Sequence, residues 1–590
     1  MAFLTFFHLF SFLLIHFVSP QFNLPPLPAG AFKKPSPETS NITVDVLIQT
    51  RNVTATIRGL RFSYGNSYRG IPYAEAPIGS LRFAYAKRKD PFGIVNALEY
   101  GAACSQKEMK VAIGESKSAE DCLFINVFTP LNVTKDSKLP VYMFYHYGGY
   151  VGGNGNMDQG IFPNLVNRGP IIMVSMNYRV GPFGFFTTRD SVAPGNWATS
   201  DWIEALNWVN RYISFFGGDP KRITIGGQSA GAESVSAITL TPFSKSLFNQ
   251  VIQESGSSFD ATIMSYSEKT RNTSEYLSIG LNCSTKEQWE RRDSFSDILS
   301  CLRNKTVSQI MKIDDTLPNH RSKWSLVQDN KYFTEKLEVL AMKRNKSINV
   351  LIGNVNSEWI FFEDRSYMTT NVNSSRNSAS QIEKDLAESY EISYYSNPQS
   401  VLTAVQNVYM KSNTSNVNNH VHWEAKRLQV HSLHLFINWN TFQVWSEMVF
   451  IGPVLRDSLF YRSNGNTVYL YSLDWLSPNA MPDVIEQTLR GVSHGSELAY
   501  LFTTSCQFYN CTSGDNILRQ FFSSSWVNFI KYGNPTPSGS KLPFRWLPMD
   551  KSNRYLSFTP TPKMESNYYP NASVWTCSAP KIDGYIAPFC

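Results

Sequence analysis

Residues 223–240 read Ile-Thr-Ile-Gly-Gly-Gln-Ser-Ala-Gly-Ala-Glu-Ser-Val-Ser-Ala-Ile-Thr-Leu. The apolar, β-branched start of this stretch predicts a strand, the glycines predict a tight turn, and the small residues after them predict a helix. Such a turn holds the Ser229 hydroxyl out of the sheet, beside the helix N-terminus, where backbone N–H groups and the helix dipole favour negative charge. The context therefore favours Ser229 as a nucleophile.

The pattern Gly-x-Ser-x-Gly by itself is weak evidence, because the chain contains it twice, at residues 227–231 and 491–495. Only the first copy follows a β-branched run. Residues 483–490, before the second copy, are typical of a solvated helix. We therefore place the nucleophile in the first copy, against the alternative that residues 227–231 form a merely structural glycine-rich turn.

Strand-like and helix-like segments alternate along the chain. Strands are predicted at residues 140–145, 171–178, 223–227, 248–254, 349–353 and 467–473, and residues 201–216 predict a helix with one apolar face. Further strands and turns are expected between residues 44 and 83. This alternation predicts an α/β fold with a large, mostly parallel central sheet flanked by helices and interrupted by long loop and helical insertions.

Chemically useful residues follow the ends of these strands. His-Tyr-Gly-Gly at residues 146–149 follows the strand at 140–145, and its glycines allow backbone N–H groups to approach a ligand closely. Glu358 lies just beyond the strand at 349–353, and His494 lies in a glycine-flanked loop after the strand at 467–473. Functional groups gather at the carboxyl edge of a parallel sheet, and the order Ser229, Glu358, His494 is that of an α/β-hydrolase.

Composition argues against several other functions. The 54 Lys and Arg exceed the 47 Asp and Glu by only seven, and the excess is scattered, so nucleic-acid binding is not expected. No glycine-rich phosphate loop follows a strand, and we expect no cofactor. A histidine-rich stretch could suggest a metal site, but its interleaved apolar residues favour a packed helix, and we expect no metal; the residues are His420, His422, Glu424, His431 and His434.

The amino-terminal residues predict entry into the secretory pathway. Residues 3–18 form an apolar run of signal-peptide length that ends before Pro20, although basic residues are missing before it. We expect a signal peptide at residues 1–20, a Pro-rich leader at 21–43, one catalytic domain at 44–575 and a cysteine-containing tail at 576–590. No membrane span is expected after cleavage. The alternatives are a retained signal anchor or residence in the lumen of the secretory pathway.

Eight cysteines and eleven Asn-x-Ser/Thr sequons fit an oxidising compartment, and with the leader they predict a secreted glycoprotein. The glycosylation candidates are Asn41, Asn52, Asn132, Asn272, Asn282, Asn304, Asn345, Asn373, Asn413, Asn510 and Asn571. The sequence predicts no particular oligomeric state.

Several separate motifs resemble the type-B carboxylesterases, of the carboxylesterase/cholinesterase family. Residues 216–231 resemble the nucleophile signature of that family, and Glu-Asp-Cys-Leu-Phe-Ile-Asn-Val at residues 120–127 resembles its second signature. Asn-Tyr-Arg-Val-Gly at 177–181, Gly-Ile-Pro-Tyr-Ala at 70–74 and Trp-Val-Asn-Phe at 526–529 match as well. The resemblance covers roughly residues 44–556.

The resemblance implies a serine esterase of the α/β-hydrolase fold with the triad Ser229, Glu358 and His494. It implies oxyanion donors at Gly148, Gly149 and Ala230. It also implies disulfides Cys104–Cys122 and Cys283–Cys301, which leave Cys506, Cys511, Cys577 and Cys590 in one of three pairings.

Four positions depart from the family pattern. Gln228 replaces the glutamate beside the nucleophile, Tyr147 replaces the first oxyanion-loop glycine, and Trp359 replaces the glycine after the acid. Cholinesterases carry a tryptophan where this chain has Ala112, so the main aromatic face of a choline site is missing. None of these changes deletes a catalytic group, and we expect them to affect substrate shape.

The predicted function is hydrolysis of neutral carboxylic esters, a small-molecule substrate class, through an acyl-enzyme intermediate. A non-catalytic adhesion or binding protein of the same family is the main alternative, because a fold does not fix a function. An acyl-transferring or choline-ester-hydrolysing enzyme is a further alternative. The retained triad and glycines favour the esterase.

Overall fold

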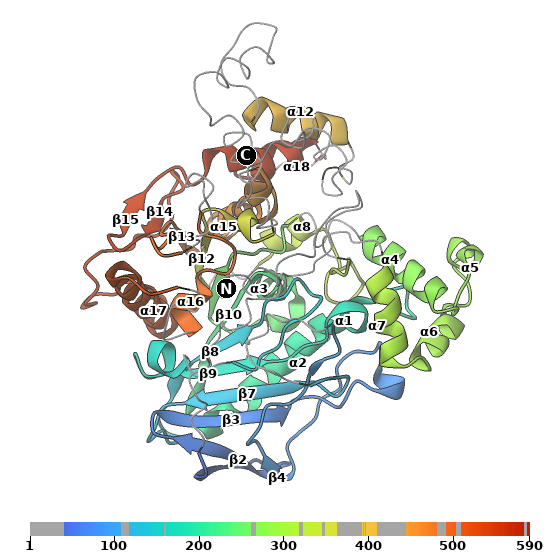
Figure 1. Ribbon diagram of the computed structural model, residues 1–590, viewed down its shortest axis with the longest axis horizontal. Helices are drawn as coiled ribbons and strands as arrows, with labels where there is room; N and C mark the ends of the chain where they lie inside the picture. Colours follow the sequence, from blue (N-terminus) through green and yellow to red (C-terminus); the bar gives the residue numbers. More distant parts are fainter. Residues whose placement is uncertain are drawn as a thin grey trace, which may run out of the picture.

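The chain folds around one large sheet in the computed structural model (Figure 1). The structure describes residues 40–107, 117–157, 161–260, 267–317, 323–344, 348–362, 392, 395, 397–409, 444–480, 491–502, 509–582, 584 and 587–590. The sheet has 13 strands, and all but β4 follow the order β1-β2-β3-β7-β9-β8-β10-β11-β12-β13-β14-β15. From β9 to β14 neighbouring strands are parallel.

The strands that carry the candidate site lie in the parallel part. They are β8 (Leu139–Tyr145), β9 (Ile172–Met176), β10 (Gly218–Gln228), β11 (Gln250–Glu254), β12 (Asn349–Val355), β13 (Thr467–Leu473) and β14 (Tyr555–Phe558). The flanking strands are β1 (Thr43–Gln49), β2 (Thr54–Phe62), β3 (Gly65–Pro72), β4 (Gly93–Asn96), β7 (Phe124–Thr129) and β15 (Lys563–Glu565). A separate small sheet pairs β5 (Ala103–Cys104) with β6 (Ser118–Ala119).

Both faces of the parallel sheet are buried, which explains the nearly continuous apolar runs of its strands. In β8, Val141, Met143 and Tyr145 belong to one hydrophobic cluster, whereas Tyr142 and Phe144 belong to a second. The first cluster includes α2 (Trp197–Tyr212), α3 (Ala230–Leu240) and α15 (Gly452–Ser463), and the second includes α16 (Leu498–Phe502) and α17 (Ser513–Tyr532). Successive side chains of a strand point to opposite faces, so strands such as β8 and β13 supply both cores.

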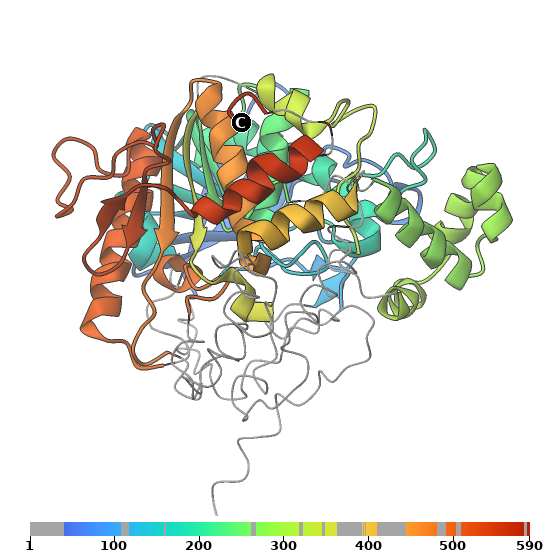
Figure 2. The same cartoon turned by 90° about the horizontal axis from the view of Figure 1, so that it is seen from above.

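Four helices project from one side of the sheet in both cartoon views (Figures 1 and 2). They are α4 (Ser267–Gly280), α5 (Lys286–Arg291), α6 (Phe295–Arg303) and α7 (Val307–Thr316), and the disulfide Cys283–Cys301 joins the turn between α4 and α5 to α6. The remaining described helices are α1 (Gly181–Phe185), α8 (Leu337–Met342), α12 (Pro398–Tyr409) and α18 (Ala579–Ile582).

Two further disulfides have both cysteines in the described part of the chain. They are Cys104–Cys122 and Cys577–Cys590, and Cys511 is disulfide-bonded as well. Of the three possible pairings of the last four cysteines, the structure thus contains the one that joins Cys577 to Cys590.

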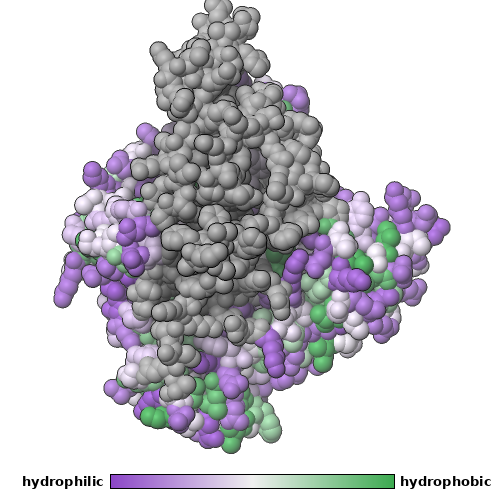
Figure 3. All heavy atoms as spheres, in the orientation of Figure 1, coloured by the Kyte–Doolittle hydropathy of each residue, from purple (hydrophilic) through white to green (hydrophobic). Residues whose placement is uncertain are grey.

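Apolar side chains are exposed at the β1–β4 end of the sheet. Phe92 is 88% exposed and Ile94 is 61% exposed, and Ile42 and Leu47 are exposed nearby in the sheet. Figure 3 shows hydrophobic atoms gathered at this end of the molecule. This end lies far along the sheet from the strands that carry the candidate site.

The predicted α/β-hydrolase architecture is confirmed, with small shifts of element boundaries. The helix expected at 201–216 begins earlier, at Trp197, and its last four residues form a 3-10 turn at Ile213–Phe216. Asn196 precedes it with a φ of 57°, a left-handed conformation that separates the helix from the preceding loop.

Several predictions fall outside the described residues. These are the signal peptide and most of the leader, the helix at 483–490, Ala112, Cys506, the histidine-rich stretch at 420–434, and the sequons at Asn345, Asn373 and Asn413.

Candidate active site

Ser229 occupies the turn between β10 and α3. Its backbone has φ 56° and ψ −129°, a strained conformation for a residue with a side chain, and its N–H donates to the carbonyl oxygen of Glu254 at 2.9 Å. The neighbouring glycines are required by close packing, because a Cβ at Gly231 would collide with the carbonyl oxygen of Tyr145. The sequence pattern thus has a steric cause, and it leaves the serine at the carboxyl edge of the sheet.

His494 and Glu358 meet beside this turn. Glu358 follows β12 and is fully buried, and its Oε2 lies 2.5 Å from His494 Nδ1. The other carboxylate oxygen, Oε1, accepts the Val355 N–H at 3.0 Å. Two hydrogen bonds therefore fix the carboxylate, and the carboxylate fixes the orientation of the imidazole.

The second imidazole nitrogen contacts Gln228. Gln228 Nε2 lies 3.2 Å from His494 Nε2. An amide NH₂ group can only donate, so His494 Nε2 presents its lone pair and the ring proton is on Nδ1, facing Glu358. This tautomer is the one that a general base toward Ser229 requires.

Among the described residues, no hydrogen bond joins the Ser229 hydroxyl to His494. The imidazole lone pair is instead directed at the Gln228 amide, which belongs to the residue just before the serine. Hydrogen bonds between catalytic groups are often long in a substrate-free enzyme and tighten when substrate binds. A short rotation of the Ser229 side chain or of the amide is therefore required before proton transfer.

Backbone N–H groups without an acceptor among the described residues occur in the loop after β8 and at the start of α3. Gly148 has a φ of 119°, and a Cβ there would collide with the Gly152 carbonyl oxygen, so only glycine fits. The Gly148 and Gly149 N–H groups donate to no acceptor in the described part of the chain. Ala230 is the first residue of α3, where an N–H has no acceptor within its own helix.

His146 stabilises the loop that holds these glycines. Its ring stacks on Tyr178 with 4.0 Å between ring centroids, and its Nδ1 lies 2.8 Å from the Tyr147 carbonyl oxygen. Burial lowers the pKa of His146 to about 4, so the ring stays neutral at physiological pH. It therefore acts as a rigid support for the loop.

Two more carboxyl groups are buried behind the imidazole, Glu254 and Glu497. Ser255 donates to Glu497 at 3.0 Å, and Trp526 donates to Glu254 at 2.6 Å, while one oxygen of each carboxyl has no partner among the residues that the structure describes. Burial and then repulsion from Glu497 raise the pKa of Glu254 well above its usual range. Burial and then the charge of Glu358 raise the pKa of Glu497 to about 7.

Glu497 should make folding stability dependent on pH. The folded protein holds its proton up to about pH 7, whereas an unfolded chain releases it near pH 4.5, so stability should fall as the pH rises between these values. This difference corresponds to roughly 3 kcal/mol. Glu497→Gln should therefore raise the melting temperature at pH 8 and change it little at pH 5, as measured by thermal unfolding. An equal change at both pH values would contradict this assignment.

Sequence reasoning identified Ser229, Glu358 and His494 as candidates, and the structure places all three at the carboxyl edge of the parallel strands. Sequence reasoning did not identify the Gln228–His494 contact or the carboxyl groups of Glu254 and Glu497. Glu497 lies three residues after His494, and Glu254 ends a predicted strand. These two positions in the sequence are the only signal that could have indicated Glu254 and Glu497 as residues of the site.

Within the described residues, no group of three or more His, Cys, Asp or Glu side chains could hold a metal ion. None of the described helices is long and apolar enough to cross a membrane. Trp359, the residue after the acid, is buried and stacks on Trp445 with ring centroids 5.1 Å apart.

Comparison with known proteins identifies the family. The profile described as the carboxylesterase family matches residues 45–575. A medium-chain fatty acyl-CoA hydrolase precursor from Anas platyrhynchos is 28% identical over 513 residues, which cover 84% of this chain and 85% of that protein.

Two further relatives are similar to the same extent. Carboxylesterase 5A from Homo sapiens is 28% identical over 543 residues, covering 88% of this chain and 86% of that protein. Juvenile hormone esterase from Tribolium castaneum is 29% identical over 501 residues, covering 80% of each chain. With a family match across most of its length and this site geometry, the chain belongs to the carboxylesterase family, the serine hydrolases that act on carboxylic esters.

Proposed function

We propose that the protein hydrolyses neutral carboxylic esters through an acyl-enzyme. His494 Nε2 takes the hydroxyl proton of Ser229 as its Oγ attacks the ester carbonyl carbon, and the protonated imidazole then gives that proton to the departing alcohol. Water attacks the acyl-serine by the same route and releases the carboxylic acid and the free serine. Glu358 holds the imidazole and stabilises its positive charge. The observation that carries the proposal is the 2.5 Å contact between His494 Nδ1 and Glu358 beside the Ser229 turn.

The negative charge that develops on the carbonyl oxygen requires donors in fixed positions. We assign these to the N–H groups of Gly148, Gly149 and Ala230. Two of them have no acceptor among the described residues, and the third opens a helix whose dipole favours the charge. Donors held in place before the reaction need no reorganisation when the charge appears.

A fluorophosphonate probe tests the proposal directly. The purified protein should be labelled at one site, Ser229→Ala should abolish labelling, and Ser493→Ala should leave it intact. Ser493 is the matched control because it is the serine of the second Gly-x-Ser-x-Gly sequence. A protein that takes no label would support the adhesion or binding alternative, and label on Ser493 would overturn the assignment of the nucleophile.

The proposal includes secretion and glycosylation. All eight sequon asparagines in the described part of the chain are exposed, as attachment of a bulky glycan requires. The disulfides fit an oxidising compartment. Removal of N-glycans by an endoglycosidase should lower the apparent mass of the protein recovered from the medium of expressing cells.

Choline esters should not be preferred over neutral esters, and aromatic or short-acyl esters should be good substrates. Ala112 lacks the aromatic face that a quaternary ammonium needs, a contact worth roughly 0.5–2 kcal/mol. Gln228 is neutral, so the residue next to Ser229 offers no carboxylate to attract a cation. The measurement is kcat/KM for acetylthiocholine against its uncharged isostere. A ratio well above about one hundred would reveal a substitute cation site.

A further inference from the structure

Helix α4, one of the four helices that project from the sheet, carries a line of exposed side chains (Figure 1). Glu268, Asn272 and Tyr276 follow one another at intervals of four residues, and all three are exposed, whereas Leu277 and Ser278 beside them are buried. Residues four apart in a helix are neighbours on one face. The outer face of α4 therefore presents an acid, an asparagine and an aromatic ring in successive turns.

Tyr276 is the member of this line that the protein itself leaves uncovered. It is 58% exposed, and its side chain makes no hydrogen bond, ion pair or ring contact with another residue in the part of the chain that the structure describes. The charged side chains around it pair with one another, because Glu268 binds Arg189 and Arg271 lies 3.9 Å from Glu275. A partner for the Tyr276 ring must therefore be something other than these charges.

A glycosylation sequon occupies the preceding turn. It is Asn272-Thr273-Ser274, and Asn272 is four residues before Tyr276. The Cβ atoms of such a pair are about 5–6 Å apart. Helical side chains lean toward the helix N-terminus, so the Tyr276 ring lies over the turn that carries Asn272. A sugar attached to the Asn272 side-chain nitrogen begins within reach of that ring.

The first sugar of an N-glycan suits an aromatic partner. In β-linked N-acetylglucosamine the ring substituents are equatorial, so C–H groups point outward from both faces of the sugar ring. These weakly positive C–H groups complement the negative face of an aromatic ring, and the contact removes apolar surface from water. We propose that the N-glycan of Asn272 folds back along α4 and packs its first N-acetylglucosamine on the Tyr276 ring. This inference rests on the glycosylation proposed above.

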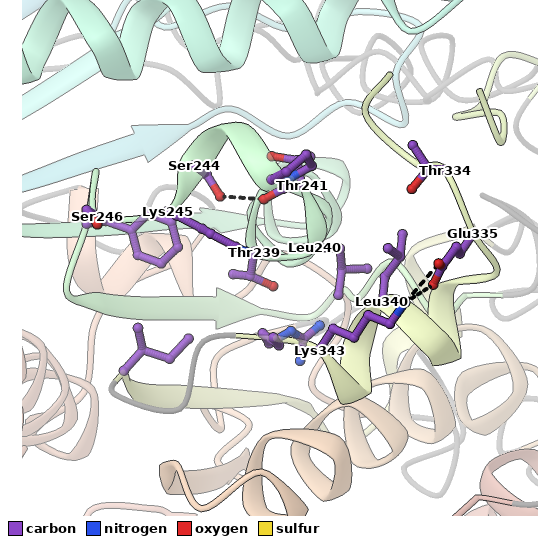
Figure 4. A pocket seen from close by; sticks show the side chains of 14 residues that line it. Thr239, Leu240, Thr241, Ser244, Lys245, Ser246, Thr334, Glu335, Leu340 and Lys343 are labelled. Atoms are coloured by element: carbon purple, nitrogen blue, oxygen red, sulfur yellow. Dashed lines mark hydrogen bonds and ion pairs between the residues drawn. The ribbon is translucent and has the colours of Figure 1, made fainter. Parts of the chain in front are cut away.

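The cavity at the end of α3 offers a sugar no such contact. It has a volume of about 170 Å³, and the one aromatic residue in its described lining, Phe248, is buried. Lys343 and Glu335 form an ion pair on its α8 side (Figure 4). A hollow of this size accepts a molecule such as benzene, whereas a branched glycan is much larger. An exposed ring beside the attachment point is the better partner.

Hydroxyl-radical footprinting of the full-length glycoprotein tests the contact. Glycopeptide mass spectrometry should first show that Asn272 is occupied in protein recovered from the medium. Tyr532 is the internal control, because it is also 58% exposed at the end of a helix, α17, and Asn528, four residues before it, begins no sequon. In Asn272→Gln protein the two tyrosines should be oxidised at similar rates. In the glycosylated parent Tyr276 should be oxidised at least about twofold more slowly than Tyr532, since a stacked sugar covers one ring face.

Trimming the glycan distinguishes a stacked sugar from a bulky glycan that only shadows the helix. The parent should be produced in cells that make only high-mannose glycans and treated with an endoglycosidase that leaves the first N-acetylglucosamine on the asparagine. Tyr276 should stay protected after this treatment, because the sugar that contacts the ring is still present. The ratio of Tyr276 to Tyr532 oxidation is the measurement.

A double-mutant cycle tests whether the contact stabilises α4. In glycosylated protein, Tyr276→Ala should speed hydrogen exchange of the α4 amides by about twofold to tenfold, the range expected for one aromatic contact. In the Asn272→Gln background the same change should have little effect, since the sugar is already gone. Tyr276→Phe keeps the ring and should exchange like the parent.

Three results would overturn the inference. The first is an unoccupied Asn272 in the secreted protein. The second is a Tyr276 that is as reactive as Tyr532 in the parent or becomes so after trimming. The third is an equal effect of Tyr276→Ala with and without the sugar. Occupancy of the other sequons, read from the same glycopeptides, tests the proposed glycosylation separately, and ester hydrolysis is tested by the fluorophosphonate experiment.

Discussion

Replacing His494 by alanine should lower kcat on a neutral aryl ester by about 10⁴-fold or more, and Ser229→Ala should do the same. Without the imidazole, no group takes the proton from the serine, and without the serine no acyl-enzyme forms. The double variant should be hardly worse than either single variant, because the two residues act as one unit. Turnover of the ester under saturating conditions is the measurement.

Both variants should remain folded, since each replaces a polar side chain at a site that the surrounding sheet holds in place. A melting temperature close to that of the parent protein separates loss of chemistry from loss of structure. Activity of the parent should also fall on acidification, because a protonated imidazole cannot act as a base. A folded His494→Ala protein that retains a near-normal rate would remove His494 from the mechanism.

The strands of the parallel sheet could be predicted because burial on both faces makes them continuous apolar runs. The runs at 140–145 and 467–473 correspond to β8 and β13 almost residue for residue. The nucleophile turn was predictable for a different reason. Only glycine fits at position 231, because a Cβ there would collide with the Tyr145 carbonyl oxygen. The fold therefore requires a residue that can be recognised in the sequence.

Contacts between residues far apart in the chain could not be predicted in the same way. Gln228 and His494 are 266 residues apart, and nothing in either neighbourhood specifies that an amide will face the imidazole. The guanidinium of Arg344 lies against Asp457 and Tyr461, which a different helix supplies. Such contacts depend on how whole helices and strands pack against one another. The periodicity of apolar residues in the sequence indicates only which face of each helix or strand is buried.

Replacing Glu358 by glutamine should lower kcat by about 10⁴-fold although the new side chain has nearly the same shape. Glu358 Oε1 accepts the Val355 N–H, and Oε2 accepts the proton on His494 Nδ1. In glutamine, the amide oxygen can keep the bond to Val355, and the NH₂ group then faces Nδ1. Two donors cannot face each other, so the imidazole proton moves to Nε2 and the lone pair needed for Ser229 is lost.

Glu497→Gln is the matched control for this experiment, because Glu497 is also buried close to His494 but makes no hydrogen bond with the imidazole in the described structure. We expect it to change kcat by less than about tenfold, since it alters a charge and leaves the tautomer in place. The rate of fluorophosphonate labelling should follow kcat in both variants, because it depends on the same base. If folded Glu358→Gln protein kept its activity within about tenfold of the parent, the carboxylate would not be what holds the proton on Nδ1.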